Sequence, residues 1–365
     1  MAKLTMMDHI EDTGRVLQRA YDERTDYGKD FVKLLTEGDY KKIYFTGSGT
    51  SYNAMRVVRN TFVELLHVEG IAIEPTVFTY SESINPSSIF RPDQILVIGL
   101  SQHGDSLSTC EALQRAADEG YSTVGVSEQL GSPIERIANH YLHLVCEEEQ
   151  IGPETRGYTE TLFQFYILAL EVAKAKGLIG REKYKRLDAD AKQALTNYAT
   201  IVAESKAWYA ANADELIKMQ KSSIAGYGYN FPTAQEGRLK FFETFGRPST
   251  AYEMEEQLHG PLRAYDADNY IFLIGGNAGP EFNRMKDIAA YYRRAWTEHV
   301  FVISGEPFDA TSKDLQFSIQ TTPLLSPIFY TVPFQVLSAQ LSEAVGIDTS
   351  VSPVKDKSIS GHMNH

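Results

Sequence analysis

Residues 42–66 read KIYFTGSGTSYNAMRVVRNTFVELL. The first five residues are mostly apolar and of β-favouring types, which predicts a short buried strand. Glycines and hydroxyl side chains fill the next five positions, Gly47 to Ser51, and a stretch with helical periodicity follows. A strand, a short loop and a helix form the repeating unit of a parallel sheet. This stretch therefore predicts an α/β fold.

The same pattern recurs in two sets of four. Short apolar runs that predict strands occupy residues 42–46, 94–100, 122–127 and 141–146, and then residues 222–228, 269–275, 299–304 and 315–320. Corresponding runs lie about 175 to 180 residues apart. A long apolar helix is expected after the fourth run of each set, from Thr161 and from Ser326. We predict two tandem, doubly wound parallel sheets of the flavodoxin-like type.

The length of 365 residues favours two domains over one core. We expect an N-terminal helical segment, a first domain, a second domain and a C-terminal tail, over residues 1–39, 40–200, 205–345 and 346–365. Residues 180–220 contain little Gly or Pro after Gly180. They are therefore expected to form a helical connector.

The composition of the chain argues against two classes of partner, nucleic acids and membranes. The net charge of −13 and the absence of long basic runs argue against a nucleic-acid partner. The charged N-terminus does not resemble a signal peptide, and no apolar stretch approaches the ~18 residues of a membrane span. Two cysteines, Cys110 and Cys146, are too few for a disulfide framework. We expect a cytoplasmic protein without a membrane partner.

Two predicted loops are rich in hydroxyls, and both precede helices. The first covers Gly47 to Ser51, and the second covers Ser101 to Ser106, which reads SQHGDS. Helix N-termini with flanking hydroxyls form a cradle for a phosphate monoester. The alternative is that Ser51 and Ser106 only cap their helices. Neither a dinucleotide fingerprint nor an NTP loop is matched, and the equivalent loops of the second half lack hydroxyl clusters.

A second feature lies between Gln235 and Leu262. A predicted helix places Glu236, Lys240 and Glu243 on one face, and His259 follows in a loop. A cation and a second carboxylate beside a glutamate can tune it as a general base, and histidine titrates near neutrality. The alternative is an ordinary solvated ion-pair face.

These motifs together resemble the sugar isomerase (SIS) domain family. The closest similarity is to the tandem-SIS isomerase half of glucosamine-6-phosphate synthases and to fructosamine-6-phosphate deglycases. The resemblance rests on GTS at Gly49 to Ser51, on SQHGDS, and on EGRLKFFE with HGP sixteen residues after its last Glu. It extends from about residue 40 to the C-terminus. It implies a metal-independent enzyme without a cofactor, acting on a sugar phosphate in a homodimer or a dimer of dimers with shared active sites.

The resemblance also implies a role for each matching residue. Glu243 would move a proton between C1 and C2, Glu236 and Lys240 would order the site, and His259 would open the sugar ring from a second subunit. Lys357 would form a Schiff base with the open-chain ketose, with Lys355 as an alternative. The residues expected to hold the phosphate and nearby hydroxyls are Ser48, Gly49, Thr50, Ser51, Ser101, Gln102, His103, Ser106 and Thr155.

Three departures from the synthase pattern shape the expected activity. His103 stands where the synthase usually has Ser, and residues 152–157 replace a more apolar loop. No glutaminase domain is seen before residue 40. The sequence therefore favours deglycase chemistry, the release of an amine and an aldose 6-phosphate from a ketosamine 6-phosphate. An aldose–ketose isomerase, a synthase-like or deaminase-like isomerase and a non-catalytic phosphosugar sensor remain alternatives.

Overall fold

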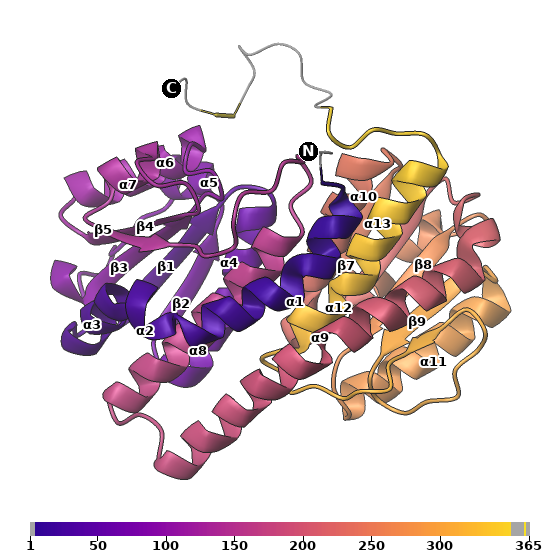
Figure 1. The fold of residues 1–365 in the computed structure, drawn as a ribbon. Helices are drawn as coiled ribbons and strands as arrows, with labels where there is room; N and C mark the ends of the chain where they lie inside the picture. The colour runs from indigo at the N-terminus through magenta and orange to yellow at the C-terminus, as the bar shows by residue number, and fades with distance from the viewer. Residues whose placement is uncertain (1–3, 352–360, 363–365) are drawn as a thin grey trace. The chain divides into compact units, whose positions relative to one another are not determined.

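The computed structural model describes residues 4–351 and 361–362, which divide into two compact units, each built around one sheet (Figure 1). Within the described residues, the first unit comprises 15–149, 156–191 and 361–362, and the second comprises 4–14, 150–155 and 192–351. The N-terminal residues and the 150–155 loop therefore group with the second sheet. The predicted domain limits along the sequence remain a prediction.

The first unit contains a five-stranded parallel sheet in the order β2-β1-β3-β4-β5. Its strands are β1 (Lys42–Gly47), β2 (Glu69–Ile73), β3 (Ile95–Leu100), β4 (Ser122–Ser127) and β5 (His140–His143). The predicted strands are confirmed, although β5 ends three residues earlier than expected. β2 was missed because it is a partly exposed edge strand containing Gly70.

Helices cover both faces of this sheet. The helices of this unit are residues 15–22 of α1 (Met6–Asp22), α2 (Arg24–Tyr27), α3 (Lys29–Glu37), α4 (Thr50–Leu66), α5 (Pro75–Tyr80), α6 (Leu107–Asp118), α7 (Pro133–Ile137) and α8 (Arg156–Ala175), with a 3₁₀ turn η1 (Pro92–Gln94). The consecutive β1 residues Tyr44 and Phe45 point to opposite faces, as the strand period requires. Tyr44 packs against Phe78 of α5, while Phe45 packs against Phe62 of α4. The first unit is thus doubly wound.

The second unit repeats this topology with the strand order β10-β9-β8-β6-β7. Its strands are β6 (Ser222–Gly226), β7 (Ser249–Glu253), β8 (Tyr270–Gly275), β9 (Val300–Ser304) and β10 (Leu315–Gln316). β6, β8, β9 and β10 take the places that β1, β3, β4 and β5 take in the first sheet. The tandem duplication and the α/β class are therefore confirmed. β7, like β2, is an edge strand that its sequence, STAYE, did not reveal.

The helices of the second unit include the segment that carries the predicted base. They are α9 (Arg181–Leu216), α10 (Phe231–Thr244), α11 (Pro280–Ala295), α12 (Ser326–Tyr330) and α13 (Val332–Ala344), with 3₁₀ turns η2 (Gly228–Asn230), η3 (Glu256–Leu258) and η4 (Pro261–Ala264). α10 follows β6 as α4 follows β1. The single helix predicted from Ser326 is wrong in detail, because α12 ends at Tyr330 and α13 begins at Val332, with Thr331 between them. Pro333 has no N–H to donate within a continuous helix, and it lies in the first turn of α13 instead.

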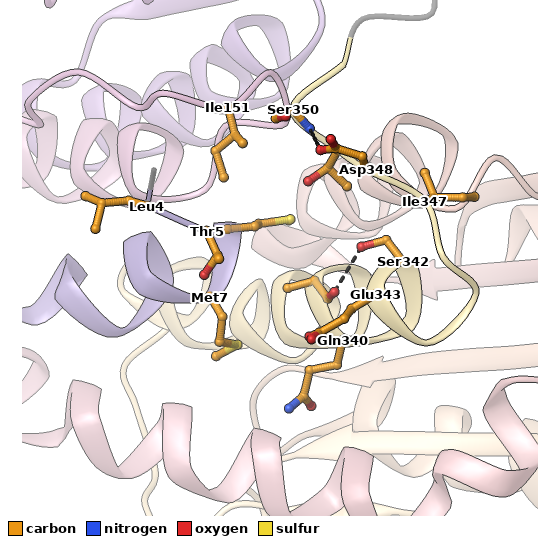
Figure 2. Close-up of a pocket in the computed structure, with 13 residues that line it drawn as sticks. Leu4, Thr5, Met7, Ile151, Gln340, Ser342, Glu343, Ile347, Asp348 and Ser350 are labelled. Carbon is orange, nitrogen blue, oxygen red and sulfur yellow. Dashed lines mark hydrogen bonds between the residues drawn. The ribbon is translucent and has the colours of Figure 1, made fainter. Parts of the chain in front are cut away.

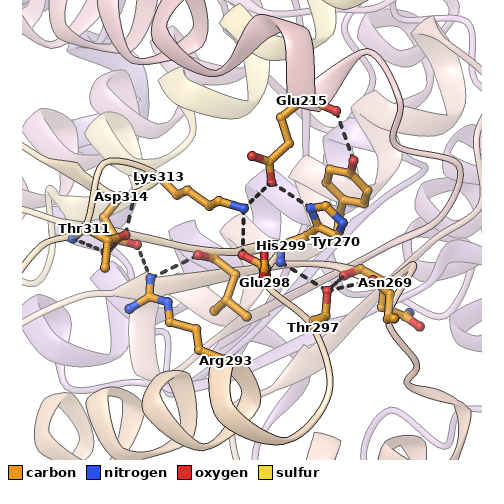
Figure 3. A network of polar contacts seen from close by, with 12 residues as sticks. Glu215, Asn269, Tyr270, Arg293, Thr297, Glu298, His299, Thr311, Lys313 and Asp314 are labelled. Carbon is orange, nitrogen blue, oxygen red and sulfur yellow. Dashed lines mark hydrogen bonds and ion pairs between the residues drawn. The ribbon is translucent and has the colours of Figure 1, made fainter.

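At the amino-terminal edge of the second sheet, a polar network joins α9 to the strands (Figure 3). The Glu215 carboxylate lies 2.7 Å from His299 Nδ1 and accepts a 2.7 Å hydrogen bond from Lys313 Nζ. The ring of Tyr270 stacks on His299 with a centroid separation of 4.2 Å. Partial burial alone would raise the pKa of Glu215, but its bonds to His299 and Lys313 outweigh it and lower that pKa. His299 is thus a structural histidine.

Candidate functional site

The two hydroxyl-rich loops lie side by side at the carboxyl ends of β1 and β3. Ser48 Oγ is 3.1 Å from Ser108 Oγ and accepts a 3.4 Å hydrogen bond from the Ser106 hydroxyl. Ser101 Oγ accepts a 3.2 Å bond from the Ser106 amide. This is the switch point of the sheet, where β1 leads outward to β2 and β3 leads to β4 in the opposite direction. The loops predicted to bind phosphate are therefore brought together.

The capping alternative for these serines is not supported by the structure. Ser106 occupies the N-cap position of α6, yet its side chain makes no cap bond. Ser51 lies inside the first turn of α4, whose N-cap is Gly49 in a positive-φ conformation (58°). Neither serine hydroxyl caps the N–H groups at the start of its helix. The N-termini of both helices therefore suit an anionic ligand.

The remaining loop residues differ in their exposure. Thr50, Ser51, Ser101 and Gln102 are buried, whereas Ser48 and Gly49 are exposed. A hydrogen bond fixes the side chain of Gln102, because its Nε2 donates to Cys146 Sγ at 2.7 Å. A Cβ at Gly157, in the first turn of α8, would lie 2.2 Å from Gln102 Nε2. A side chain at position 157 would therefore require the Gln102 amide to shift.

His103 extends the loop into a cavity of about 450 Å³. The cavity is also lined by Glu128, Gln129, Leu130, His143 and Glu148. Burial and the neighbouring charge of Glu148 raise the pKa of Glu128, which His103 partly offsets. The cavity thus brings two carboxylates, those of Glu128 and Glu148, to the same space as His103.

The last described residues contact the second hydroxyl loop. Gly361 O accepts a 2.9 Å hydrogen bond from the Leu107 amide, and His362 Nδ1 lies 2.9 Å from Asp105 Oδ1. Both candidate Schiff-base residues, Lys355 and Lys357, lie outside the described residues. Their assignment remains a prediction.

The candidate base cluster forms on α10 in the second unit. Lys240 and Glu236 are completely buried, while the side chain of Glu243 is 33% exposed. Lys240 Nζ lies 3.3 Å from Glu236 Oε1 and 2.6 Å from Glu243 Oε2. The face is thus a buried ion-pair cluster with one accessible carboxylate, and the solvated-face alternative is not supported.

Lys240 remains charged in this setting. Burial alone would lower the pKa of Lys240, but the carboxylates of Glu243 and Glu236 outweigh it and raise that pKa above its usual value. The charge of Glu154, from the 150–155 loop, adds to the same effect. This loop is fixed to α13, because the buried Gln335 Nε2 donates a 3.0 Å hydrogen bond to Thr155 O. Thr155 thus groups with the residues of the second unit, and its expected part in holding the phosphate remains a prediction.

His259 is exposed between η3 and η4. The pKa of Glu255 is lowered mainly by its hydrogen bond from Arg284, and His259 adds to this shift. Among the described residues of one chain, no bond joins His259 to Glu243 or Lys240. Its role in opening the sugar ring in the site of a second subunit remains a prediction.

Two contributors escaped the sequence reasoning. Ser108 contacts Ser48, and the hydroxyl spacing after Ser106 could have indicated it. Glu154 raises the pKa of Lys240 although the two residues are far apart in the sequence. The only hint in the sequence was that residues 152–157 replace a loop that is more apolar in the synthase. No group of three or more metal-ligating side chains is found among the described residues. Nor does any helix of the described part have the length and apolar character needed to cross a membrane.

The sequence of this chain is similar to that of known proteins. The SIS domain family matches residues 39–171. The glutamine–fructose-6-phosphate aminotransferase (isomerizing) of Acidithiobacillus ferridurans is 29% identical over 321 residues, which cover 85% of this chain and 50% of that protein. The chain thus spans about half the length of the curated relatives it matches.

Solved structures agree over nearly the whole chain. A proposed phosphosugar isomerase from Clostridium difficile 630 superposes with a TM-score of 0.86 and 28% identity, covering 98% of this chain and 97% of the other. The C-terminal domain of the glucosamine–fructose-6-phosphate aminotransferase of Francisella tularensis gives a TM-score of 0.81 at 19% identity, covering 95% and 98%. At that identity the second comparison speaks for the fold alone. Residues 39–171 match the SIS domain family, and the chain as a whole has a tandem fold of two flavodoxin-like SIS-type units.

Proposed function

We propose that this protein is an enzyme that acts on a ketosamine 6-phosphate by proton transfer between C1 and C2, in the manner of a fructosamine-6-phosphate deglycase. The observation that carries the proposal is the cluster on α10. A buried lysine between two carboxylates serves little purpose for solubility, and it leaves one partly exposed carboxylate, that of Glu243, facing outward.

The reaction follows from these groups. Glu243 takes a proton from C1 of the open-chain ketosamine to give the enaminol, and it returns a proton to C2 to give the imine at C1. Water adds to the imine carbon, and the C–N bond breaks to give an aldose 6-phosphate and the free amine. General acid–base groups typically contribute ~10² to 10⁴ in rate. Lys240 is a positioning residue, since its 2.6 Å bond holds the Glu243 carboxylate in place.

The hydroxyl loops supply the binding energy in this proposal. The N-termini of α4 and α6, together with Ser51, Ser101 and Ser106, would hold the phosphate, and His103 would add a charge-dependent contact. His259 of a neighbouring subunit would open the sugar ring. Lys357 would engage the open-chain carbonyl, and the hydrogen bond of Gly361 to Leu107 is consistent with the tail reaching this loop.

A nitrogen-containing substrate suits the accessible carboxylate of this cluster. The carboxylates of Glu243, Glu236 and Glu154 all raise the pKa of Lys240. The protonated nitrogen of a ketosamine would be attracted to the partly exposed carboxylate of Glu243. The names of the sequence relatives, which are aminotransferases of a hexose 6-phosphate, point the same way.

The test is a substrate panel followed by product analysis. Wild-type protein is incubated with N-substituted fructosamine 6-phosphates, glucosamine 6-phosphate and fructose 6-phosphate, and released amine and aldose 6-phosphate are quantified. We expect amine release from the fructosamines, about 10³-fold or more slower in Glu243→Gln and unchanged in the exposed-site control Glu182→Gln. Interconversion of the plain ketose alone would indicate an isomerase. Binding of these compounds without turnover would indicate a sensor.

A further inference from the structure

A cavity of about 410 Å³ lies within the second unit, between the opening of α1 and the C-terminal part of α13 (Figure 2). Figure 2 shows Leu4 and Ile151 on one side of it, with Glu343 and Ile347 on the other. The described residues that line it include no member of the cluster on α10 and none of the hydroxyl loops. Contacts that bear on the proposed reaction lie instead in the first unit, around Gln102 of the second hydroxyl loop.

Three contacts hold Gln102 in the loop after β3. Its backbone carbonyl accepts a 2.8 Å hydrogen bond from the Glu128 amide, and its side-chain Nε2 donates to Cys146 Sγ at 2.7 Å. The third contact is steric, because a Cβ at Gly157 in the first turn of α8 would lie 2.2 Å from Nε2 and 2.7 Å from Cδ. Gln102 is buried, and a side chain packed this closely has few orientations open to it. The groups that place α8 and Cys146 therefore also place the Gln102 amide.

Glu149 places the first turn of α8. Its side chain belongs to a residue that is only 6% exposed, and its Oε1 accepts a 2.7 Å hydrogen bond from the Gly157 amide. This amide is one of those at the start of a helix that have no partner within the helix, and a carboxylate is favoured at this end. The bond thus fixes the same glycine that packs against Gln102.

The segment that carries both Cys146 and Glu149 is itself anchored. Arg156 is 3% exposed, and its Nη2 donates to Glu147 O at 3.2 Å and to Glu148 O at 3.0 Å. Glu147 has a φ of 63°, which is uncommon for a residue other than glycine. Two arginines of α1 pair with its carboxylate at 2.6 and 2.5 Å. Residues 146–149 are therefore held against the start of α8 from both sides of the segment.

We propose that Glu149 and Cys146 are positioning residues that fix the Gln102 amide for the phosphate of the substrate. The inference rests on the proposed function, in which the hydroxyl loops hold the sugar phosphate. Glu149 acts through the Gly157 amide and Cys146 through its direct bond, so neither touches the substrate. Nε2 of a glutamine has two N–H groups, of which Cys146 would take one and the phosphate the other. An amide fixed before binding loses less side-chain entropy when the phosphate arrives.

A double-mutant cycle tests this coupling through calorimetric binding of fructose 6-phosphate, which needs no turnover. Glu149→Ala and Cys146→Ala should each raise Kd about 10-fold. Glu149→Gln and Cys146→Ser keep a hydrogen-bond acceptor and should stay within about twofold of wild type. In a Gln102→Ala background, Glu149→Ala should add less than about twofold, because the side chain through which it acts is gone.

Glu171→Ala is the matched control on the same helix. It removes a carboxylate that binds Arg24 and Tyr184 at the other end of α8, so Kd should stay at the wild-type value even if the melting temperature falls. Thermal unfolding is measured for every variant. Should Glu149→Ala not fold, Cys146→Ala takes its place in the cycle with Gln102→Ala.

The outcomes separate this inference from the proposed function. If the cycle behaves as expected but no amine is released from any fructosamine 6-phosphate, the positioning role stands while the deglycase proposal fails. If amine is released while Glu149→Ala and Cys146→Ala bind as wild type does, the deglycase proposal stands and the positioning role is overturned. An equal loss of affinity with and without the Gln102 side chain would also overturn it, as would a wild-type protein that does not bind fructose 6-phosphate.

Discussion

Lys240 is the residue on which the α10 cluster depends. It is fully buried beside the fully buried Glu236, and removing one member of a buried ion pair leaves an uncompensated charge. We therefore predict that Lys240→Met lowers the free energy of unfolding by about 3 to 5 kcal/mol, measured by urea denaturation. Glu236→Gln added to this variant should restore part of the loss. If Lys240→Met were as stable as wild type, the charges of Lys240, Glu236 and Glu243 would not compensate one another in the folded state.

At the scale of elements, the close approach of α8 to the loop after β3 controls Gln102. A Cβ at position 157 would collide with Gln102 Nε2 at 2.2 Å, so Gly157→Ala should displace the glutamine from the phosphate loop. We expect KM for the sugar phosphate to rise about 10-fold with little change in kcat, because ground-state binding is affected. Gly180→Ala is the matched control, since nothing lies within 4 Å of a Cβ there. Equal steady-state constants for the two variants would contradict this role of α8.

Helix α8 also carries a buried acid that should shape the pH dependence of stability. Burial raises the pKa of Glu160 to about 8, although Arg19 and Arg156 partly offset this. Its pKa in the unfolded chain is about 4.3, so between these values the folded state keeps a proton that the unfolded state releases. This group therefore makes stability fall as pH rises, by up to about 1.4 kcal/mol per pH unit.

Glu160→Gln removes that titration, which gives a direct check. Urea unfolding of wild type and variant at pH 5.5 and 7.5 should show the variant gaining about 1 to 3 kcal/mol relative to wild type at the higher pH. Parallel pH dependences for the two proteins would show that Glu160 ionises normally in the folded state.

At the scale of the whole molecule, the shared-site proposal predicts complementation between chains. Glu243→Gln and His259→Ala are each expected to be inactive alone. If His259 serves the site of a partner, half of the dimers formed after subunit exchange are mixed, and one of the two sites in each is intact. Activity of about one quarter of wild type should then appear. Mixed dimers, confirmed by mass spectrometry of differently tagged chains, that stay inactive would place His259 and Glu243 in the same chain.

The sequence predicted those parts of this molecule that depend on local periodicity. Interior strands such as β1 and β8 are largely apolar and buried along their whole length. Helical spacing alone placed Glu236, Lys240 and Glu243 on one face. Edge strands β2 and β7 were missed because a half-exposed edge needs no apolar run.

The electrostatic interaction of Glu154 with Lys240 could not be predicted from the sequence either. It joins positions 86 residues apart (240 − 154) through a loop whose path is fixed by Gln335, and no local pattern records such a contact.

Deuterium incorporation is the sharpest measurement of whether Glu243 moves a proton between C1 and C2. Wild-type protein and Glu243→Gln are incubated with a fructosamine 6-phosphate in D₂O, and the sugar phosphate is examined by proton NMR, with binding confirmed by calorimetry. We expect deuterium at C2 of the aldose 6-phosphate formed by wild type. In the variant we expect no exchange at C1 or C2 despite nearly unchanged affinity. Exchange at the wild-type rate in Glu243→Gln would contradict this role of Glu243.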